Sequence, residues 1–216
     1  MSAIRRVPTR LAIAAAAAMV LACAPRLKPL PGAPAPGARL PVAALQDGHR
    51  QTVFDWTWSD PDLTVRGEGV ARTASPDSAR LDFFIGGGAG GGYAVLVGDT
   101  LRAPGDRALI ERLIPPVPML WAALGRLALP PVGDTLVSAQ GDTIRADFGS
   151  PVAWRVTFRG DSLVRVERVA NGRVVEWIDR DAGRVRYRNE TSRRQLELSI
   201  TRSAPLPAFD ASIWRP

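Results

Sequence analysis

Residues 152–159 read Val-Ala-Trp-Arg-Val-Thr-Phe-Arg, and apolar and polar side chains alternate along this stretch. Successive side chains of a β-strand point to opposite faces of the sheet, so Trp154, Val156 and Phe158 would share one face. A strand with one apolar and one polar face is typical of an antiparallel sheet that covers a core on one side and meets water on the other. The stretch therefore predicts a half-buried antiparallel strand.

The same alternation recurs elsewhere in the chain, with turn signals between the segments. The alternating segments are residues 54–58, 81–85, 184–188 and 195–200. A Gly-Asp-Thr or Gly-Asp-Ser turn signature occurs at residues 98–100, 133–135, 141–143 and 160–162. Asn171-Gly172 is a strong hairpin signal, because a type I′ turn needs positive φ at both central residues. Together these patterns predict an antiparallel meander.

One stretch departs from the strand pattern. From Asp106 to Leu129 the apolar residues follow helical spacing, with Asp106 as the N-cap. Pro115, Pro116 and Pro118 would split this stretch into two short helices. A curved sheet with one apolar face needs a cover, and these helices are the candidates. The predicted fold class is mainly β, a curved antiparallel sheet covered by a short α lid.

The N-terminus carries the features of an export signal. Arg5, Arg6 and Arg10 precede the uncharged residues 11–22, which are too few to span a membrane comfortably. Val20-Leu21-Ala22-Cys23 resembles the lipobox of bacterial lipoproteins, in which the cysteine is acylated, for example with palmitate, and becomes the first residue. The alternative is an ordinary signal peptide with an incidental cysteine. Two or three acyl chains on Cys23 would give essentially permanent membrane attachment.

Residues 1–22 are thus expected to be a lipoprotein signal peptide, residues 23–50 a lipidated cysteine with a proline-rich tether, and residues 51–216 one folded domain. The tether would extend roughly 50 Å in polyproline conformation. Ala24 follows the cysteine, and by resemblance to the lipoprotein sorting rule the absence of aspartate there favours the outer membrane. We expect a cell-envelope protein that faces the periplasm.

The positive charge has a targeting part and a surface part. Removing the signal segment takes three arginines from the formal net charge of +7 and leaves about +4. Between Arg155 and Arg202 twelve arginines face seven acids, mostly alternating with apolar residues, which is typical of the solvated face of a sheet. A nucleic-acid site would need a clustered patch. We predict no nucleic-acid partner, with weak attraction to anionic lipid headgroups as a minor alternative.

Residues that carry catalysis are sparse. His49 is the only histidine and Cys23 the only cysteine, so neither a metal shell nor a nucleophile and base pair can be assembled. A pair of carboxylates is conceivable in an open cleft, but no spacing singles out two of them. The glycine-rich run from Gly86 to Gly92 lacks the ending of a P-loop and predicts a hairpin tip. We predict no enzyme, no catalytic residue, no metal and no cofactor.

Two segments resemble a known family. The run from Gly67 to Thr73, then Pro76 and residues 80–84, resembles the opening hairpin of the periplasmic lipoprotein carrier and outer-membrane lipoprotein receptor superfamily, the LolA/LolB type. Residues 209–214 are similar to the closing segment of the carriers. The resemblance implies an unclosed β-barrel whose concave apolar face, lidded by short helices, receives acyl chains. The lipidated form looks more like the receptor, although residues 86–92 lack the large apolar side chain that the receptor resemblance leads us to expect.

The resemblance also implies a ligand cavity between sheet and lid, which binds acyl chains or a lipoprotein. Its expected lining is Trp56, Trp58, Phe83, Leu113, Leu120, Trp121, Leu124, Trp154 and Phe158. The alternative is a non-catalytic envelope scaffold or assembly lipoprotein whose tryptophans fill the core. We expect a monomer attached to the membrane by its N-terminal lipid. A void of several hundred Å³ under the helices would favour ligand binding.

Overall fold

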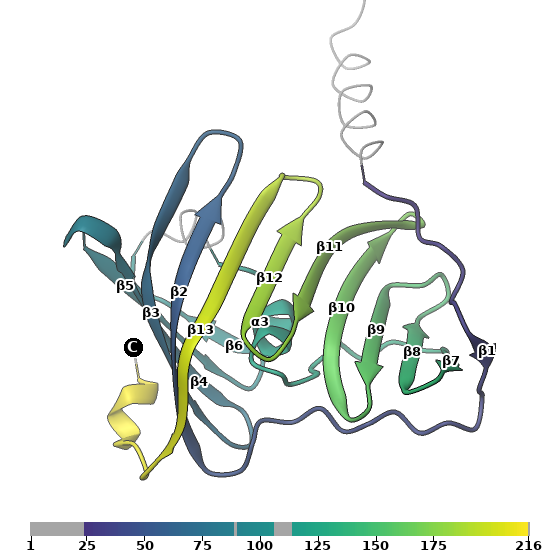
Figure 1. Ribbon diagram of the computed structural model, residues 1–216, viewed down its shortest axis with the longest axis horizontal. Coiled ribbons are helices and arrows are strands. Elements are labelled where there is room, and N and C mark those ends of the chain that lie inside the picture. Colours follow the sequence, from purple (N-terminus) through teal and green to yellow (C-terminus); the bar gives the residue numbers. More distant parts are fainter. Residues whose placement is uncertain (1–23, 89, 106–113, 216) are drawn as a thin grey trace, which may run out of the picture.

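The computed structural model describes residues 24–88, 90–105 and 114–215 (Figure 1). Strands make up 53% of the described residues and helices only a small share, so the predicted mainly-β class is confirmed. The strands form one antiparallel sheet that is not closed into a barrel. No helix within the described ranges has the length and apolarity needed to cross a membrane.

The described residues contain thirteen strands. They are β1 (Ala33–Pro34), β2 (His49–Ser59), β3 (Thr64–Ala74), β4 (Ser78–Ile85), β5 (Gly91–Val97), β6 (Thr100–Arg102), β7 (Thr135–Gln140), β8 (Thr143–Phe148), β9 (Trp154–Arg159), β10 (Ser162–Ala170), β11 (Arg173–Arg180), β12 (Arg184–Asn189) and β13 (Arg194–Leu206). The helical elements within the described residues are η1 (Gly86–Gly88), α3 (Val117–Ala123) and η2 (Ala211–Trp214).

The sheet consists of two meanders joined where the chain returns to its start. Its strand order is β1-β7-β8-β9-β10-β11-β12-β13-β2-β3-β4-β5-β6. The join is the antiparallel pairing of β13 with β2, which sets Leu198 opposite Trp56 and Leu196 opposite Trp58. The predicted meander is therefore correct within each half. The sequence patterns did not predict the long-range pairing of β13 with β2, which joins the two halves into one sheet.

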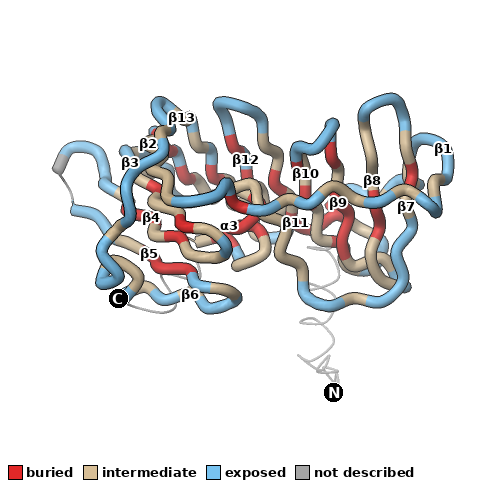
Figure 2. Tube along the Cα trace, turned by 90° about the horizontal axis from the view of Figure 1, so that it is seen from below, coloured by how far each residue is buried: buried red, intermediate tan, exposed pale blue. Residues whose placement is uncertain are grey.

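The core lies on one face of this sheet, which we call the inner face, and α3 packs against it over β10, β11 and β12. Figure 2 shows the buried residues along the middle strands and around α3. Four of the seven residues of α3 are buried, including Trp121, whose indole N–H donates to the Gly98 carbonyl at 2.8 Å. The helix thus closes the apolar face, as expected from its sequence.

The helical prediction needs one correction. We expected the second lid helix to reach Leu129, but α3 ends at Ala123. Gly125 adopts φ +88°, and a Cβ there would meet the Arg180 guanidinium at 2.8 Å, so the chain leaves the helix at this point. Most of the first predicted helix, residues 106–113, lies outside the described residues.

The glycines that resemble the family's opening hairpin have a packing reason. Gly69 on β3 lies under the ring of Phe54 from the adjacent strand, and a Cβ at this position would approach that ring to 2.4 Å. Aromatic side chains of β2 can therefore lie flat across β3. The closing segment also packs on the sheet, since η2 contacts β4 and β5 and the Ile213 carbonyl accepts from Arg80 at 3.4 Å.

The proline-rich segment is extended but is not a free tether. It runs along the lower edge of the sheet in Figure 1, from β1 to β2. Residues 33–34 pair with β7, the Leu27 N–H donates to the Gly172 carbonyl at 2.8 Å, and Leu45 is buried in the core. The sequence predicted a tether, but the described part of this segment packs on the sheet, because extended prolines can lie along a sheet edge. The domain boundaries themselves stay predictions.

Candidate functional site

A cavity of about 370 Å³ lies between the inner face of the sheet, the end of α3 and residues 42–46. Its volume falls within the range of about 300–1,000 Å³ that is usual for small-molecule sites. Its wall is mostly aliphatic and aromatic, with a few polar groups. The apolar lining includes Leu45, Phe54, Ala71, Leu81, Phe83, Leu120, Leu124, Ile178, Val185, Leu196, Leu198 and Ile200.

Strands β2 to β4 form one wall of the cavity. The ring of Phe83 lies edge-on to Phe54, with ring centroids 5.9 Å apart, and edge-on to Trp56 at 5.8 Å. These T-shaped contacts fix the orientation of Phe83, which lines the cavity. Strands β11 to β13 form the facing wall, where the register sets Val185 opposite Leu198. Both walls therefore consist of alternate residues of their strands, those whose side chains point to the inner face.

The cover has two parts. Leu120, Ala123 and Leu124 come from α3, and residues 42–46 come from the proline-rich segment. The Leu127 N–H donates to the Ala43 carbonyl at 2.9 Å, which joins the two parts. The Arg180 Nε donates to the Ala123 carbonyl at 3.1 Å and joins the helix to the sheet. Short covers with few contacts are the elements that open most easily.

A polar corner lies at the rim of the cavity. Arg50 on β2 donates from Nη1 to the Ser203 Oγ at 3.2 Å, and that oxygen lies 2.9 Å from the Thr52 Oγ1. All three side chains line the cavity. The Arg50 Nε is buried without a hydrogen-bond partner. Arg180 also lines the cavity, and its burial lowers the pKa of its guanidinium below the ordinary value.

The structure divides the residues that we expected in the cavity into three groups. Phe83, Leu120 and Leu124 line it. Five others are buried in the core and are not part of the lining, namely Trp56, Trp58, Trp121, Trp154 and Phe158. Leu113 lies outside the described residues. The tryptophans support the walls: the Trp56 indole N–H, for example, donates to the Glu68 carbonyl at 2.8 Å.

Sequence reasoning missed residues 42–46, Arg50 and Arg180. Arg50 carries a usable signal, because it has the same parity as Phe54 and Trp56 and so belongs to the apolar face of β2. The same parity links Arg180 to Ile178 on β11. Residues 42–46 have no such signal, since their place depends on contacts with β2 and α3 that are distant in sequence.

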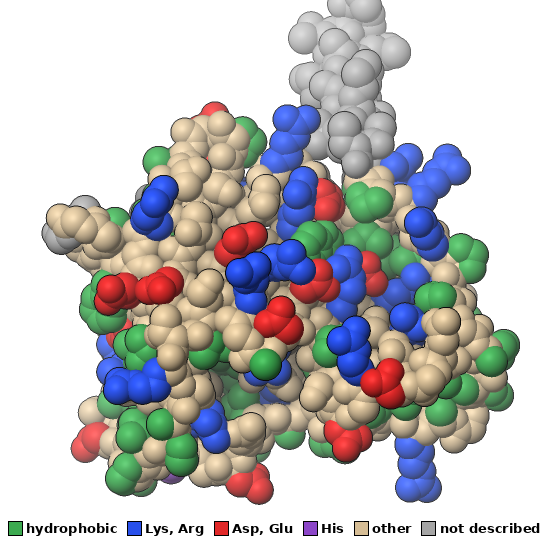
Figure 3. Space-filling view, viewed as in Figure 1, with side chains coloured by type: hydrophobic (Ala, Val, Ile, Leu, Met, Phe, Trp, Pro, Cys, Tyr) green, Lys and Arg blue, Asp and Glu red, His purple; other side chains and the backbone are tan. Residues whose placement is uncertain are grey.

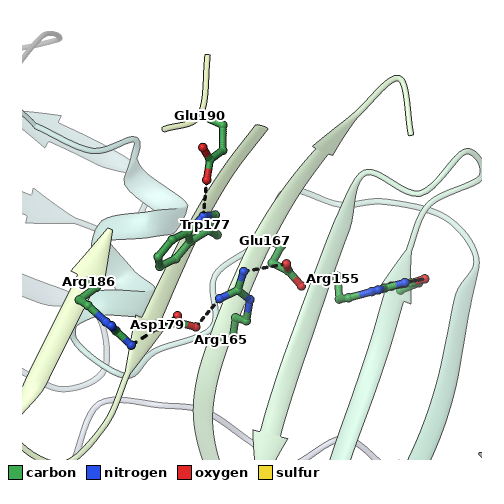
Figure 4. Close-up of polar contacts among 8 residues, drawn as sticks. Arg155, Arg165, Glu167, Trp177, Asp179, Arg186 and Glu190 are labelled. Atoms are coloured by element: carbon green, nitrogen blue, oxygen red, sulfur yellow. Dashed lines mark hydrogen bonds and ion pairs between the residues drawn. The ribbon is translucent and has the colours of Figure 1, made fainter. Parts of the chain in front are cut away.

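The outer face of the sheet is chemically different. Figure 3 shows basic and acidic side chains interspersed over it. Arg165 lies between Glu167 and Asp179 at 3.0 and 2.6 Å and stacks over Trp177 (Figure 4). Burial alone would lower the pKa of Arg165, but the two carboxylates raise it above its ordinary value. The predicted solvated face is present, and its arginines are organised as ion pairs.

The glycine-rich run connects β4 to β5, and the Ile85 N–H donates to the Gly90 carbonyl at 2.9 Å, as expected for a hairpin tip. The two residues before the run, Phe84 and Ile85, are large apolar side chains, and both are exposed. The end of β4 therefore presents the exposed apolar surface that the glycines themselves cannot provide.

An open, curved antiparallel sheet with a lidded apolar cavity defines the class of fold. No family model matches the sequence, and a comparison with curated proteins finds no match. A crystal structure of a LolA superfamily protein from Nitrosomonas europaea is similar, with a TM-score of 0.54 and 10% identity over 79% of this chain and 92% of that chain. The protein therefore has a LolA-like fold, and this part of the sequence prediction is confirmed.

Two other solved structures are more distant. A DUF1329 family protein from Desulfovibrio piger gives a TM-score of 0.47 and 8% identity over 79% of this chain and 90% of that chain. A putative outer membrane lipoprotein-sorting protein domain from Vibrio parahaemolyticus gives 0.37 and 8% over 78% and 89%.

Proposed function

We propose that this protein is a lipid-anchored protein of the cell envelope that binds acyl chains, of a lipid or of a lipoprotein, in the cavity under α3. The observation that carries the proposal is the cavity itself, about 370 Å³ with a mostly apolar wall. Each methylene group moved from water into such a wall contributes about 0.8 kcal/mol. A flexible chain of methylenes suits a narrow space between a sheet and a helix.

The cover is consistent with reversible entry. α3 has seven residues and follows Pro115 and Pro116, and residues 42–46 have no strand or helix of their own. Movement of residues 42–46 breaks the hydrogen bond from Leu127 to Ala43 but leaves the strand ladder and the buried side of α3 in place. The proposed role is binding and transfer, with no catalytic step and no cofactor.

We also propose lipidation at Cys23, which is motivated by the lipobox resemblance. Cys23 lies outside the described residues, which begin at Ala24. Ala24 is buried, and its carbonyl accepts from the Arg173 Nη1 at 2.5 Å, beside the β10–β11 turn. A lipid on Cys23 would hold this corner of the sheet close to the membrane, in our proposal the periplasmic face of the outer membrane.

Blocking the cavity tests the binding proposal. Ala123→Trp places a large ring at the end of α3, where Ala123 lines the cavity. With the full chain carrying Cys23→Ala, we expect the affinity for a fluorescent fatty acid to fall about tenfold or more, because the ring occupies the chain's space. Ala208→Trp, on an exposed residue outside the lining, is the matched control and should bind normally.

The binding proposal fails if the control protein shows no saturable binding and mass spectrometry finds no lipid or lipoprotein that copurifies with it. It also fails if Ala123→Trp binds as tightly as the control while its thermal unfolding is unchanged. A ligand that ignores a ring in the cavity would be bound elsewhere.

Metabolic labelling with a palmitate analogue tests the anchor. We expect the full chain to be labelled and Cys23→Ala to be unlabelled, because no other cysteine exists in the chain. Label that persists in the variant would contradict the lipobox assignment.

One observation favours the second candidate function, a non-catalytic envelope scaffold. Trp56, Trp58, Trp121 and Trp154 are all buried in the core and outside the cavity lining, so much of the inner face is already filled. The scaffold is the function that remains if no ligand binds in the titration above.

A further inference from the structure

The cavity has a positive rim. Two arginines line it, Arg50 from β2 and Arg180 from β11. Among the described residues, neither forms an ion pair with a carboxylate. Asp161 is the one carboxylate in the lining, and it is exposed and pairs with neither arginine. The lining therefore carries an excess of positive charge beside an apolar wall.

The contacts of Arg50 leave part of its guanidinium without a hydrogen-bond partner. Its Nη1 donates to the Ser203 Oγ, which in turn shares a hydrogen bond with the Thr52 Oγ1. Its Nε is buried and has no hydrogen-bond partner. Unsatisfied buried donors are uncommon in folded proteins and call for an explanation. An acceptor bound at this corner would satisfy the Nε.

Arg180, on β11, shows a similar imbalance. Within the described residues its one hydrogen bond is from Nε to the Ala123 carbonyl, and its outer nitrogens lie over the backbone of Gly125. Burial lowers its pKa, and no carboxylate offsets this effect. A desolvated cation without a counterion is costly, which favours a bound anion.

We propose that the natural ligand of the cavity is an anionic amphiphile, with its acyl chain along the apolar wall and its carboxylate or phosphate head group beside one of the two unpaired arginines, Arg50 or Arg180. The inference rests on the proposed acyl-chain binding and adds the charge of the head group. Arginine donors are planar and suit both carboxylates and phosphates, so a fatty acid and an acyl phosphoglyceride share the required chemistry. The acylated N-terminus of a lipoprotein carries no such charge.

A panel of ligands with equal chains distinguishes these possibilities. The full chain with Cys23→Ala is titrated with a fluorescent dodecanoic acid, its methyl ester, a lysophosphatidic acid and a triacylated lipopeptide. We expect the acid to bind about tenfold or more tightly than the ester, because charge-assisted hydrogen bonds are about twice as strong as neutral ones. Comparison of the acid with the lysophosphatidic acid separates the carboxylate from the phosphate as the preferred head group.

Substitutions assign the effect to the rim. Arg50→Met and Arg180→Met, singly and together, should remove the preference for the acid while ester binding changes less than about twofold. Arg180→Lys keeps the charge and should keep much of the preference. Arg159→Met is the matched control, because Arg159 is an exposed arginine on the same sheet outside this cavity, and it should change nothing.

Each outcome has a meaning. Equal affinity for acid, ester and lipopeptide, unchanged in the double arginine variant, would overturn the inference but leave acyl-chain binding in place. Parallel loss of acid and ester binding in the arginine variants would also overturn it, since the arginines would then act by holding the cover. Absence of binding by every ligand would overturn the proposed function itself.

Discussion

Arginines on the outer face of the sheet and arginines in the cavity differ in their partners. On the outer face arginines meet carboxylates on neighbouring strands: Arg155 forms two hydrogen bonds with Asp147, and Arg72 and Arg80 share Asp82. In the cavity of the inner face Arg50 and Arg180 have no such partner within the described residues. The outer face satisfies its own charges, whereas the cavity presents charge that its walls do not satisfy.

This difference indicates which surface is the better candidate for binding an anionic ligand. Arginine count alone favours a broad, open groove of about 840 Å³, which is lined by eight basic and three acidic side chains and shares Arg180 with the cavity. Two of those arginines, Arg155 and Arg165, are already paired with carboxylates at 3.0 Å or less. Fewer arginines in a less polar environment give the stronger case for anion binding.

The largest effect on stability is expected for two neighbouring residues of β9 that point to opposite faces of the sheet. Phe158 on β9 is fully buried on the inner face, and its neighbour Thr157 points to the outer face. Phe158→Ala should lower the free energy of unfolding by about 3–5 kcal/mol, because it leaves a cavity in the core. Thr157→Ala should change it by less than about 0.5 kcal/mol. Urea unfolding followed by circular dichroism measures both, and similar effects would refute the division into faces.

The next effect concerns the outer-face ion pair of Arg155 and Asp147, which are 7% and 6% exposed. Asp147→Ala should lower the free energy of unfolding by about 3 kcal/mol, because it leaves Arg155 buried without a counterion. The double variant Asp147→Leu with Arg155→Met should recover most of this loss. If Asp147→Ala unfolds like the natural protein, unpaired arginines are tolerated anywhere on the sheet and the contrast with the cavity loses its meaning.

A smaller change in stability is expected when the cavity is given its own carboxylate. Ser203→Asp places an acid where the Ser203 hydroxyl now accepts from Arg50. The free energy of unfolding should change by less than about 1 kcal/mol, since the site is exposed. Binding of the fluorescent dodecanoic acid should nevertheless fall, because Arg50 is then paired. Unchanged binding would argue that Arg50 does not meet the head group.

The smallest effect is a local one at the closing segment. The Asp210 carboxylate accepts from the Ser212 side chain and backbone N–H, and these hydrogen bonds lower its pKa below the ordinary 3.8. Because the folded-state pKa is depressed, the contribution to η2 is present above about pH 4 and is lost as the pH falls through the folded pKa. The NMR shift of the Ser212 amide should titrate with a midpoint below 3.8. A midpoint at or above that value would show that the cap is absent in solution.

Local patterns in the sequence determined much of this protein. Alternation predicted β2, β4, β9, β12 and β13, and Asn171-Gly172 predicted the β10–β11 turn, where both residues have positive φ. These properties depend on neighbours in the chain, because the pleat and the turn geometry are set within a few residues. Apolar spacing and prolines likewise predicted a short lid helix, although they did not give its end at Ala123.

The tertiary structure alone decided where the cavity lies and what lines it. The pairing of β13 with β2 brings the two ends of the domain together, and Ser203 meets Arg50 only because of it. Residues 42–46 cover the cavity although their composition predicts a tether. The tryptophans that we expected in the cavity lining are buried in the core, whereas Arg50 and Arg180 line the cavity. The physical reason is that these contacts join residues far apart in the chain, and no local preference encodes them.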